Sequence, residues 1–377
     1  MSTQRYLPQS VFDGERLLQQ TAVVVENGII VSLEAPNGEE QVLSGVLAPG
    51  YIDIQVNGGG GALFNATPTE TALSTMIETH SCFGTTAMLP TLITDSVDKM
   101  SLAADTISRV IADKVPGIIG VHFEGPHLSV AKRGVHSTDH IRPISAQEKA
   151  IFSRDDLGVK VVTLAPENVS PEDIAFLVQH NVLVCLGHSN ATFEVTKRAL
   201  EAGATGFTHL YNAMSPFTSR EPGVVGAALE DQNSWCGIII DGHHVHPAAA
   251  KVALEAKPQG KILLVTDAMS PVGSDETEFE LLGHHVTRTG DRLNAATGQL
   301  AGSVLDMAGA VKNTVETLDV ELGEALRMAS LYPAEYLVIS NTFGRIAPGY
   351  RADFVLLNDD LTVRQTFING KSVYSGE

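Results

Sequence analysis

A glutamate and two histidines stand at the ends of separate apolar stretches of the chain. Glu124 ends His-Phe-Glu, His188 follows Val-Cys-Leu-Gly, and His209 lies in Phe-Thr-His-Leu. One carboxylate and two imidazoles suit a borderline divalent ion such as Zn²⁺ and leave one position open for water. Each histidine alone could equally be an ordinary hydrogen-bonded side chain. At matched positions on three stretches, however, the set favours a hydrolytic metal site.

A fourth polar residue, Asp267, ends another apolar stretch in Val-Thr-Asp-Ala and has no basic neighbour in sequence. A carboxylate beside a metal site can take a proton from water and pass it to a leaving amine. The alternative is an aspartate that caps a helix.

Two neutral amides, Gln55 and Asn57, close the first apolar stretch of the central region. Residues two apart in a strand face the same side. Two histidines there would suggest a second metal ion, whereas amides bind such ions poorly. We therefore expect Gln55 and Asn57 to support water or ligand at a site with one ion.

Candidate anion-binding side chains are Arg220, the pair Lys132 and Arg133, and His244. The alternative for each is a solvated surface position. The run from Gly58 to Gly61 resembles a phosphate cradle, but it lacks the Lys and Ser/Thr of a P-loop. We interpret it as a flexible turn that lets backbone approach the site.

Eight short, nearly uniformly apolar stretches separate these polar residues, and their composition is typical of parallel strands buried on both faces. Helical patterns lie between most of them, such as the helix opened by Ser170-Pro171. Strands alternating with helices predict an α/β fold, and eight units favour a closed (β/α)8 barrel over an open sheet. All polar residues at the strand ends would then meet on one rim. The predicted strands are Tyr51–Val56, Thr86–Leu92, Ile118–Phe123, Lys160–Leu164, Val182–Leu186, Gly206–Leu210, Cys236–Ile240 and Lys261–Val265.

The two chain ends resemble each other and differ from the middle. Each carries an Asn-Gly pair between β-branched runs, Asn27-Gly28 and Asn369-Gly370, which is a strong hairpin signal. We predict one small β-sandwich domain from residues 1–47 plus 344–377, and a barrel domain from residues 48–343. The alternative is two separate hairpins.

The composition excludes some classes of partner. The net charge is -19, with 44 acidic and 25 basic residues, so the surface repels nucleic acid and an anionic substrate would need a local basic pocket. The chain has 3 cysteines and no CxxC pair, which indicates a reducing compartment with structural thiols. With no signal core and no apolar run of about 18 residues, we expect a cytoplasmic protein that does not associate with membranes.

The motifs as an ordered set resemble the N-acetylglucosamine-6-phosphate deacetylases of the amidohydrolase superfamily, over essentially the whole chain. They are Pro49-Gly50-Tyr51-Ile52-Asp53-Ile54-Gln55-Val56-Asn57-Gly58, His122-Phe123-Glu124-Gly125-Pro126, Gly187-His188-Ser189-Asn190-Ala191-Thr192, Thr208-His209-Leu210-Tyr211-Asn212-Ala213-Met214, Arg220-Glu221-Pro222-Gly223 and Val265-Thr266-Asp267-Ala268. Six short motifs in this order are far more specific than any one of them.

The resemblance implies a role for each matching residue. Glu124, His188 and His209 would ligate the metal, Asp267 would be the catalytic acid and base, and His136 would act at the acetamide carbonyl. The implied substrate-binding residues are Val135, His136, Asn212, Ala213, Arg220, Asp241, His244, Leu300, Ala301 and Gly302. Leu300 to Gly302 matches a substrate-contacting loop in which the family often has Ser where this chain has Ala301. Gln55 and Asn57 match the members that hold one ion.

The implied activity is hydrolysis of N-acetyl-D-glucosamine 6-phosphate to D-glucosamine 6-phosphate and acetate, in amino-sugar catabolism, by a homodimer with one divalent ion per chain. Zn²⁺ is the expected ion, although Fe²⁺, Ni²⁺, Co²⁺ and Mn²⁺ accept the same ligands. Three alternatives stay open: the galactosamine epimer as substrate, a cyclic amide, and a non-catalytic sugar-phosphate sensor. Cyclic-amide relatives usually carry a bridging Lys on the fourth strand, where this chain has only Lys160 at the strand start.

Overall fold

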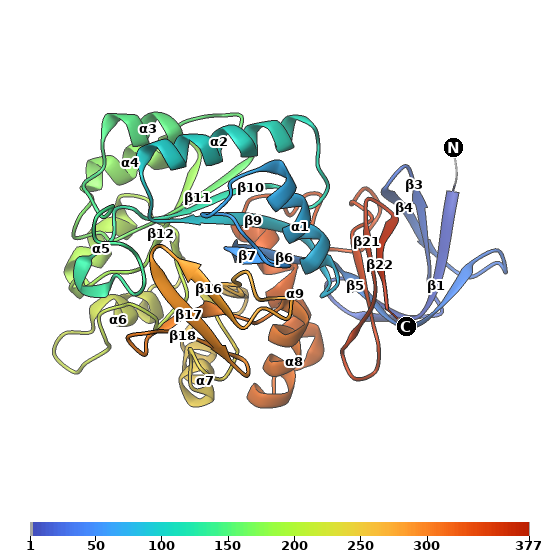
Figure 1. The fold of residues 1–377 in the computed structure, drawn as a ribbon. Coiled ribbons are helices and arrows are strands. Elements are labelled where there is room, and N and C mark those ends of the chain that lie inside the picture. Colours follow the sequence, from blue (N-terminus) through green and yellow to red (C-terminus); the bar gives the residue numbers. More distant parts are fainter. Residues whose placement is uncertain (1–2, 377) are drawn as a thin grey trace.

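The computed structural model describes residues 3–376, and its centre is a parallel eight-stranded sheet rolled into a barrel (Figure 1). The strands pair in the order β15-β14-β13-β12-β11-β10-β9-β6. A parallel bridge between Val56 and Ala268 joins the two ends of this series and closes the barrel. The strands are β6 (Tyr51–Val56), β9 (Thr85–Ile93), β10 (Gly120–Glu124), β11 (Val159–Leu164), β12 (Val182–Leu186), β13 (Gly206–Phe207), β14 (Trp235–Ile238) and β15 (Ile262–Leu264).

Helices surround the barrel, as the alternating pattern predicts (Figure 1). The Ser170 side chain accepts from the Asp173 amide at 3.1 Å, and Pro171 occupies the first helical position of α4. The helices are α1 (Glu70–Ser81), α2 (Val97–Ala112), α3 (Ala146–Phe152), α4 (Pro171–Gln179), α5 (Phe193–Glu201), α6 (Gly223–Glu230), α7 (Pro247–Ala256), α8 (Met307–Leu318), α9 (Leu322–Ala329) and α10 (Leu331–Tyr336), with a 3₁₀ turn η1 (Val130–Lys132).

Two predicted strands end two or more residues earlier than expected. The strand predicted to reach Leu210 ends at Phe207, and the one predicted to reach Ile240 ends at Ile238. In the first case His209 adopts a left-handed backbone with φ 35°, which a strand cannot continue through. Strand pairing therefore stops just before His209, the residue that carries the functional side chain.

Both chain ends contribute to a second sheet, ordered β22-β21-β20-β5-β1-β3-β4, beside the barrel (Figure 1). Both Asn-Gly pairs form the predicted turns with positive φ, at 51° and 80° for Asn27 and Gly28. The hairpins are parts of one sheet rather than separate modules, because β5 pairs with β20. The strands are β1 (Thr3–Phe12), β2 (Leu17–Gln19), β3 (Ala22–Glu26), β4 (Ile29–Glu34), β5 (Gln41–Pro49), β20 (Phe354–Leu357), β21 (Val363–Ile368) and β22 (Lys371–Ser375). The domain division at residues 47 and 344 remains our proposal.

A four-stranded antiparallel sheet follows β15 and was not expected from the sequence. It consists of β16 (Glu278–Leu281), β17 (His284–Thr289), β18 (Arg292–Ala295) and β19 (Leu300–Ser303), which we call the inserted sheet. Its apolar face packs on Leu63, Ile93 and Met269. Residues 300–302, predicted as a loop, therefore form a strand.

We expected the glycines after Asn57 to form a flexible turn at the site, but only two of them form a turn, and that turn does not line the site. Gly58 and Gly59 form strand β7 (Gly58–Gly59), which pairs with β8 (Ala62–Leu63). Gly60 and Gly61 turn between them with φ 64° and 81°. They line a separate hollow beside α1 rather than the cavity described below.

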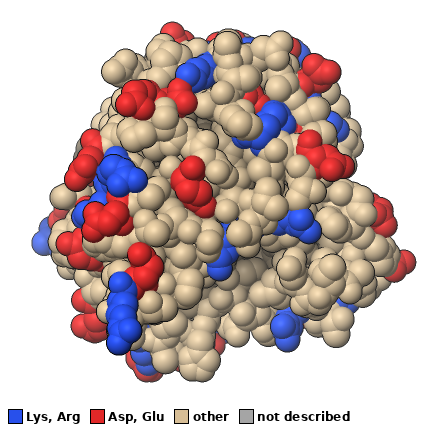
Figure 2. Space-filling view, turned by 90° about the vertical axis from the view of Figure 1, so that its left-hand side faces the viewer, with Lys and Arg blue, Asp and Glu red and all other residues tan. Residues whose placement is uncertain are grey.

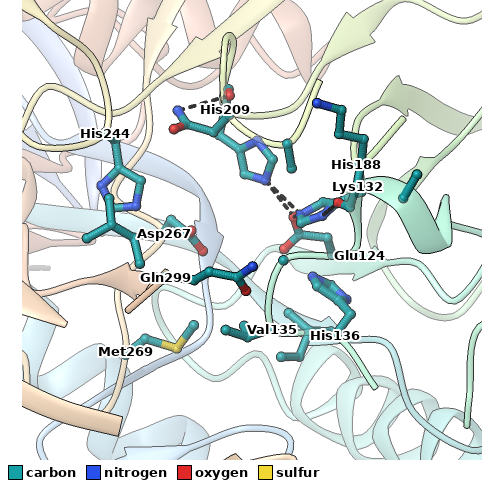
Figure 3. A pocket seen from close by; sticks show the side chains of 17 residues that line it. Glu124, Lys132, Val135, His136, His188, His209, His244, Asp267, Met269 and Gln299 are labelled. Atoms are coloured by element: carbon teal, nitrogen blue, oxygen red, sulfur yellow. Dashed lines mark hydrogen bonds and ion pairs between the residues drawn. The ribbon is translucent and has the colours of Figure 1, made fainter. Parts of the chain in front are cut away.

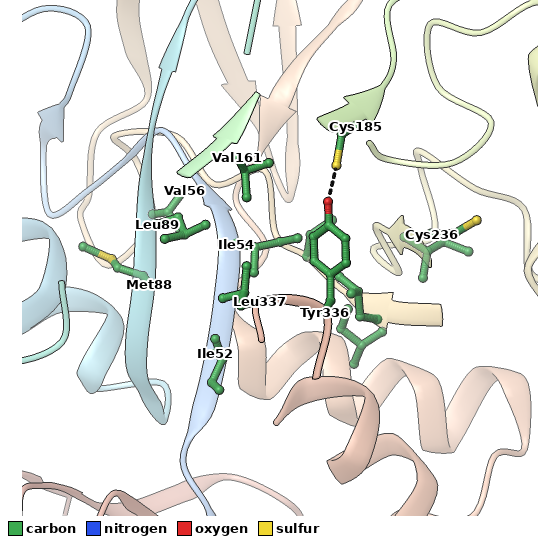
Figure 4. Packing of buried hydrophobic residues seen from close by; sticks show 14 of the residues in the cluster. Ile52, Ile54, Val56, Met88, Leu89, Val161, Cys185, Cys236, Tyr336 and Leu337 are labelled. Carbon is green, nitrogen blue, oxygen red and sulfur yellow. Dashed lines mark hydrogen bonds between the residues drawn. The ribbon is translucent and has the colours of Figure 1, made fainter. Parts of the chain in front are cut away.

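The cysteines are free, as predicted for this chain. Cys185 and Cys236 are buried in the barrel core, where the Cys185 thiol lies 2.9 Å from the Tyr336 hydroxyl at the end of α10 (Figure 4). Burial raises the pKa of Cys185 to about 11 and that of Cys236 to about 12, so both thiols are inert and structural.

Within residues 3–376, no helix combines the length and the apolar character that crossing a membrane requires.

Candidate active site

The barrel brings the three predicted metal ligands together. Glu124 ends β10, His188 follows β12, and His209 follows β13. Glu124 Oε1 lies 3.1 Å from His188 Nε2 and 3.0 Å from His209 Nε2, and the two nitrogens are 3.0 Å apart (Figure 3). All three side chains are buried, and their ligand atoms are within 4.8 Å of one another.

The hydrogen bonds around this cluster fit a bound cation. His188 Nδ1 lies 2.9 Å from the Lys132 carbonyl, which fixes the proton on Nδ1 and leaves the Nε2 lone pair facing the cluster. A lone pair, a second imidazole nitrogen and a carboxylate oxygen at this spacing repel one another unless a proton or a cation lies between them. The donor set therefore fits one divalent ion.

The Glu124 carboxylate and the two imidazoles alter each other's tendency to carry a charge. Burial opposes the ionised form of Glu124, but its interactions with the His188 and His209 imidazoles lower its pKa well below the usual value. Burial likewise opposes the charged form of His209, and the Glu124 carboxylate raises its pKa overall. The site thus holds an ionised carboxylate away from water.

Asp267 lies in the same cavity, facing the cluster (Figure 3). Burial, followed by the charge of Glu124, raises its pKa to about 6. Its backbone is left-handed with φ 53°, as are those of His188 at 46° and His209 at 35°. Strained non-glycine backbones cluster at functional sites, where surrounding contacts hold them. Here Asp267 N donates to Gln55 O at 3.0 Å, and Ser303 N donates to Asp267 O at 2.9 Å.

The two amides of β6 contact carboxylates. Gln55 Nε2 donates to Glu124 Oε2 at 3.2 Å. Asn57 Nδ2 donates to Asp267 Oδ1 at 2.6 Å. Both side chains are buried, so each amide fixes the orientation of the carboxylate it contacts.

His136 lies beside the cluster, with its ring centre 4.4 Å from that of His188 (Figure 3). Burial, and then the charge of His188, lower its pKa to about 3, so the ring is neutral near pH 7. Thr94 Oγ1 lies 2.8 Å from Nδ1. With the Thr94 hydroxyl donating to Nδ1, the other ring nitrogen is free to carry a proton toward a ligand.

A cavity of about 310 Å³ contains these groups. Most of the predicted substrate-binding residues line it: Val135, His136, Asn212, Ala213, His244, Leu300 and Gly302. Six further residues line the cavity but were not among the predicted substrate-binding residues: Ile93, Ala131, Lys132, Gly134, Met269 and Gln299. Lys132 carried a signal as a candidate anion binder, whereas Gln299 lies in the turn between β18 and β19 of the inserted sheet, which was not expected.

Three predicted residues do not line the cavity. Asp241 lies behind His244, and its carboxylate is 2.6 Å from His244 Nδ1, so it orients that ring. Ala301 alternates with Leu300 and Gly302 along β19, so its side chain faces the core of the inserted sheet. Arg220 is exposed in the loop before α6 and forms no hydrogen bond or ion pair within residues 3–376.

The fourth strand of the barrel carries a hydroxyl where a bridging Lys would be expected. Thr163 Oγ1 on β11 lies 2.7 Å from His122 Nε2 and 2.6 Å from Thr208 Oγ1. The buried end of β11 is therefore occupied by a neutral hydrogen-bonded chain. This arrangement disfavours the two-metal site of cyclic-amide hydrolases.

The fold and site have close counterparts among known proteins. The chain is 49% identical to an N-acetylgalactosamine-6-phosphate deacetylase of Shewanella sp. (strain ANA-3), with 97% of this chain and 96% of that one covered. It is 35% identical to an N-acetylglucosamine-6-phosphate deacetylase of Haemophilus influenzae, covering 94% and 95%. A crystal structure of N-acetylglucosamine-6-phosphate deacetylase from Pasteurella multocida superposes with a TM-score of 0.96 at 33% identity, covering 100% of both chains.

The match to a known family covers residues 46–373, which include the whole barrel and all the residues of the cavity. By this match and by these relatives, the chain belongs to the amidohydrolase family.

Proposed function

We propose that the protein hydrolyses the acetamide of N-acetyl-D-glucosamine 6-phosphate to D-glucosamine 6-phosphate and acetate, in amino-sugar catabolism. The observation that carries this proposal is the buried Glu124, His188 and His209 cluster with Asp267 in the same cavity. A non-catalytic sensor has no need of a carboxylate with a raised pKa beside a metal site. The names of the relatives support the substrate class.

The galactosamine epimer is the second candidate substrate. The relative named for it is 49% identical to this chain, whereas the Haemophilus relative named for the glucosamine epimer is 35% identical. Both candidates share the acetamide and the 6-phosphate and differ at C4 alone. The chemistry proposed below is the same for either.

Glu124, His188 and His209 would hold the ion, for which we propose Zn²⁺. When bound, such an ion lowers the pKa of water and polarises a carbonyl oxygen. Asp267 accepts the proton of the attacking water and later delivers it to the amine nitrogen. His136 donates to the carbonyl oxygen as negative charge develops there.

Basic side chains that line the same cavity would hold the sugar phosphate. Among the described residues that line the cavity, Lys132 is the only Lys or Arg, and no hydrogen bond or ion pair engages its ammonium group within residues 3–376. We propose that Lys132 and His244 attract the phosphate, with Asn212 and Ala213 beside them. A local positive charge of this kind would attract an anionic substrate to the site even though the net charge of the protein is -19.

The surface view agrees with a local rather than a general attraction for anions. On the face in Figure 2, acidic and basic side chains are interspersed, and the described residues form no broad basic patch there. A nucleic-acid backbone would find no continuous basic surface on this face.

We propose that Arg220 contacts a phosphate bound to a second chain. It is exposed and does not line its own cavity, and Phe217 in the same loop is 65% exposed. Aromatic residues are enriched at protein interfaces. We propose a homodimer in which this loop meets the other copy.

The first experiment measures acetate release by purified protein of known metal content, with the glucosamine and galactosamine epimers run in parallel. Faster release from the glucosamine epimer supports the proposal, and faster release from the galactosamine epimer selects the second candidate. Release from neither, with about one ion per chain and an intact fold, would support the sensor instead.

A further inference from the structure

Each of the two amides at the end of β6 forms a hydrogen bond with one oxygen of a carboxylate in the site. Gln55 holds Glu124 Oε2, while Glu124 Oε1 faces the two imidazoles at 3.1 and 3.0 Å. Asn57 holds Asp267 Oδ1 at 2.6 Å. In each carboxylate one oxygen is engaged by an amide, and the other is left for chemistry.

Backbone hydrogen bonds fix the position of Asn57 against Asp267. Asn57 N donates to Ala268 O at 2.9 Å, and Asp267 N donates to Gln55 O at 3.0 Å. The bridge between Val56 and Ala268 lies between these two bonds. The backbone pairing that closes the barrel therefore holds both the amide and the carboxylate in place. Asn57 is also buried, with 1% of its surface exposed.

The chemistry of an amide nitrogen makes this contact directional. Nδ2 donates but cannot accept, so it stabilises an unprotonated Oδ1 and disfavours a proton between the two atoms. An amide also keeps this property at every pH of interest, unlike an imidazole. The proton that Asp267 carries is thus directed to Oδ2.

We propose that Asn57 is a positioning residue that leaves Oδ2 of Asp267 as the oxygen that exchanges the proton, and that Gln55 limits Glu124 to one ligating oxygen. The inference rests on the proposed deacetylation. One proton of water moves to Oδ2 as the new C–O bond forms, and it passes to nitrogen as the C–N bond breaks. The second proton leaves with acetic acid, which then ionises.

The test compares Asn57→Asp and Asn57→Leu with Gln55→Met. Asn57→Asp keeps the shape of the side chain but replaces the donor by an acceptor. We expect both Asn57 variants to lower kcat by about 10- to 100-fold, with KM within roughly 2-fold and metal content unchanged. Gln55→Met should weaken metal affinity by about 10- to 100-fold, and excess metal should restore its kcat.

The outcomes separate this inference from a packing role and from the proposed function. Wild-type kcat in Asn57→Asp, or metal loss in the Asn57 variants but not in Gln55→Met, would overturn it. If wild-type protein releases no acetate, the deacetylation proposal has failed. The inference is then decided without turnover: the metal affinity of Gln55→Met should still fall by about 10- to 100-fold, and in crystal structures of the metal-loaded protein the Asp267 carboxylate should rotate in Asn57→Leu but not in wild type. An unrotated carboxylate, or wild-type metal affinity in Gln55→Met, would again overturn it.

Discussion

Asp267 illustrates how its surroundings make one carboxyl group useful in both directions of proton transfer. Its pKa is raised to about 6 first by burial and then by the charge of Glu124. An acid whose pKa lies near neutrality can accept a proton from water and return it to an amine within one cycle. A solvated aspartate would be too weak a base for the first step.

Replacement of this carboxyl group should separate binding from turnover. Asp267→Asn is expected to lower kcat by about 10²- to 10⁴-fold, because the amide cannot accept the proton. Metal and substrate binding should persist, since the three proposed ligands are other residues. Acetate release, metal analysis and calorimetric titration with substrate measure the three quantities. Retained turnover would remove Asp267 from the mechanism.

Lys132 gives a second prediction at this scale. Lys132→Met should raise KM for the phosphorylated substrate by about 10- to 100-fold, because the phosphate loses a charged partner. Arg133→Met is the matched control, since Arg133 is adjacent and exposed but does not line the cavity. Unphosphorylated N-acetylglucosamine should be hydrolysed equally slowly by wild type and Lys132→Met. An equal loss on that sugar would argue against a phosphate contact.

Among the elements, the inserted sheet connects the cavity to a small core of its own. Gln299, Leu300 and Gly302 line the cavity, while Leu293 and Val286 are fully buried beneath them. Ser303 then ties the end of β19 to the barrel, because its hydroxyl donates to Thr266 O at 2.6 Å. One wall of the site therefore depends on an element outside the barrel.

Leu293→Ala tests this dependence. Truncation of a buried leucine costs about 2–5 kcal/mol. We expect faster hydrogen exchange across residues 278–303 and a raised KM, with the barrel amides still protected. Val373→Ala, at an exposed position of β22 in the sheet formed by both chain ends, serves as the control. If KM and local exchange stay at wild-type values, the inserted sheet does not shape the site.

The same elements show what a sequence can and cannot predict. β6 and β12 match their predicted bounds residue for residue, because each is a short apolar run with a glycine or turn beside it. β13 ends early because His209 turns left-handed, and apolar composition does not encode that backbone choice. The inserted sheet did carry a signal: Phe279 and Leu281 alternate with exposed residues ahead of Gly283.

The site itself was predictable to the extent that the barrel alone positions it. Glu124, His188, His209 and Asp267 follow separate strands, so knowing the fold suffices to bring them together. The contact from Asn57 to Asp267 depends on the register at the closing bridge, which the sequence pattern leaves open. The distance of Arg220 from its own cavity depends on the path of a loop.

At the scale of the whole molecule, the proposed homodimer gives a test by subunit mixing. Arg220→Ala and Asp267→Asn should each be impaired as pure dimers. If Arg220 serves the cavity of the other chain, a mixed dimer contains one site with both wild-type residues. Equal mixing, after dissociation and reassociation, should then recover about a quarter of wild-type activity. No recovery, with mixed dimers confirmed by mass spectrometry, would exclude Arg220 from the cavity of the other chain.

The sheet shared by both chain ends sets an order of events during synthesis on the ribosome. Ala48 on β5 pairs with Val355 on β20, so β5 keeps one open edge until nearly the whole chain has been made. Adjacent barrel strands, by contrast, are consecutive in the chain, and the closing bridge of Val56 and Ala268 joins segments that both precede β20. Contacts between distant parts of a chain form late, and open strand edges attract other chains in the meantime. A nascent chain arrested before β20 should therefore have a folded barrel and an aggregation-prone amino-terminal sheet.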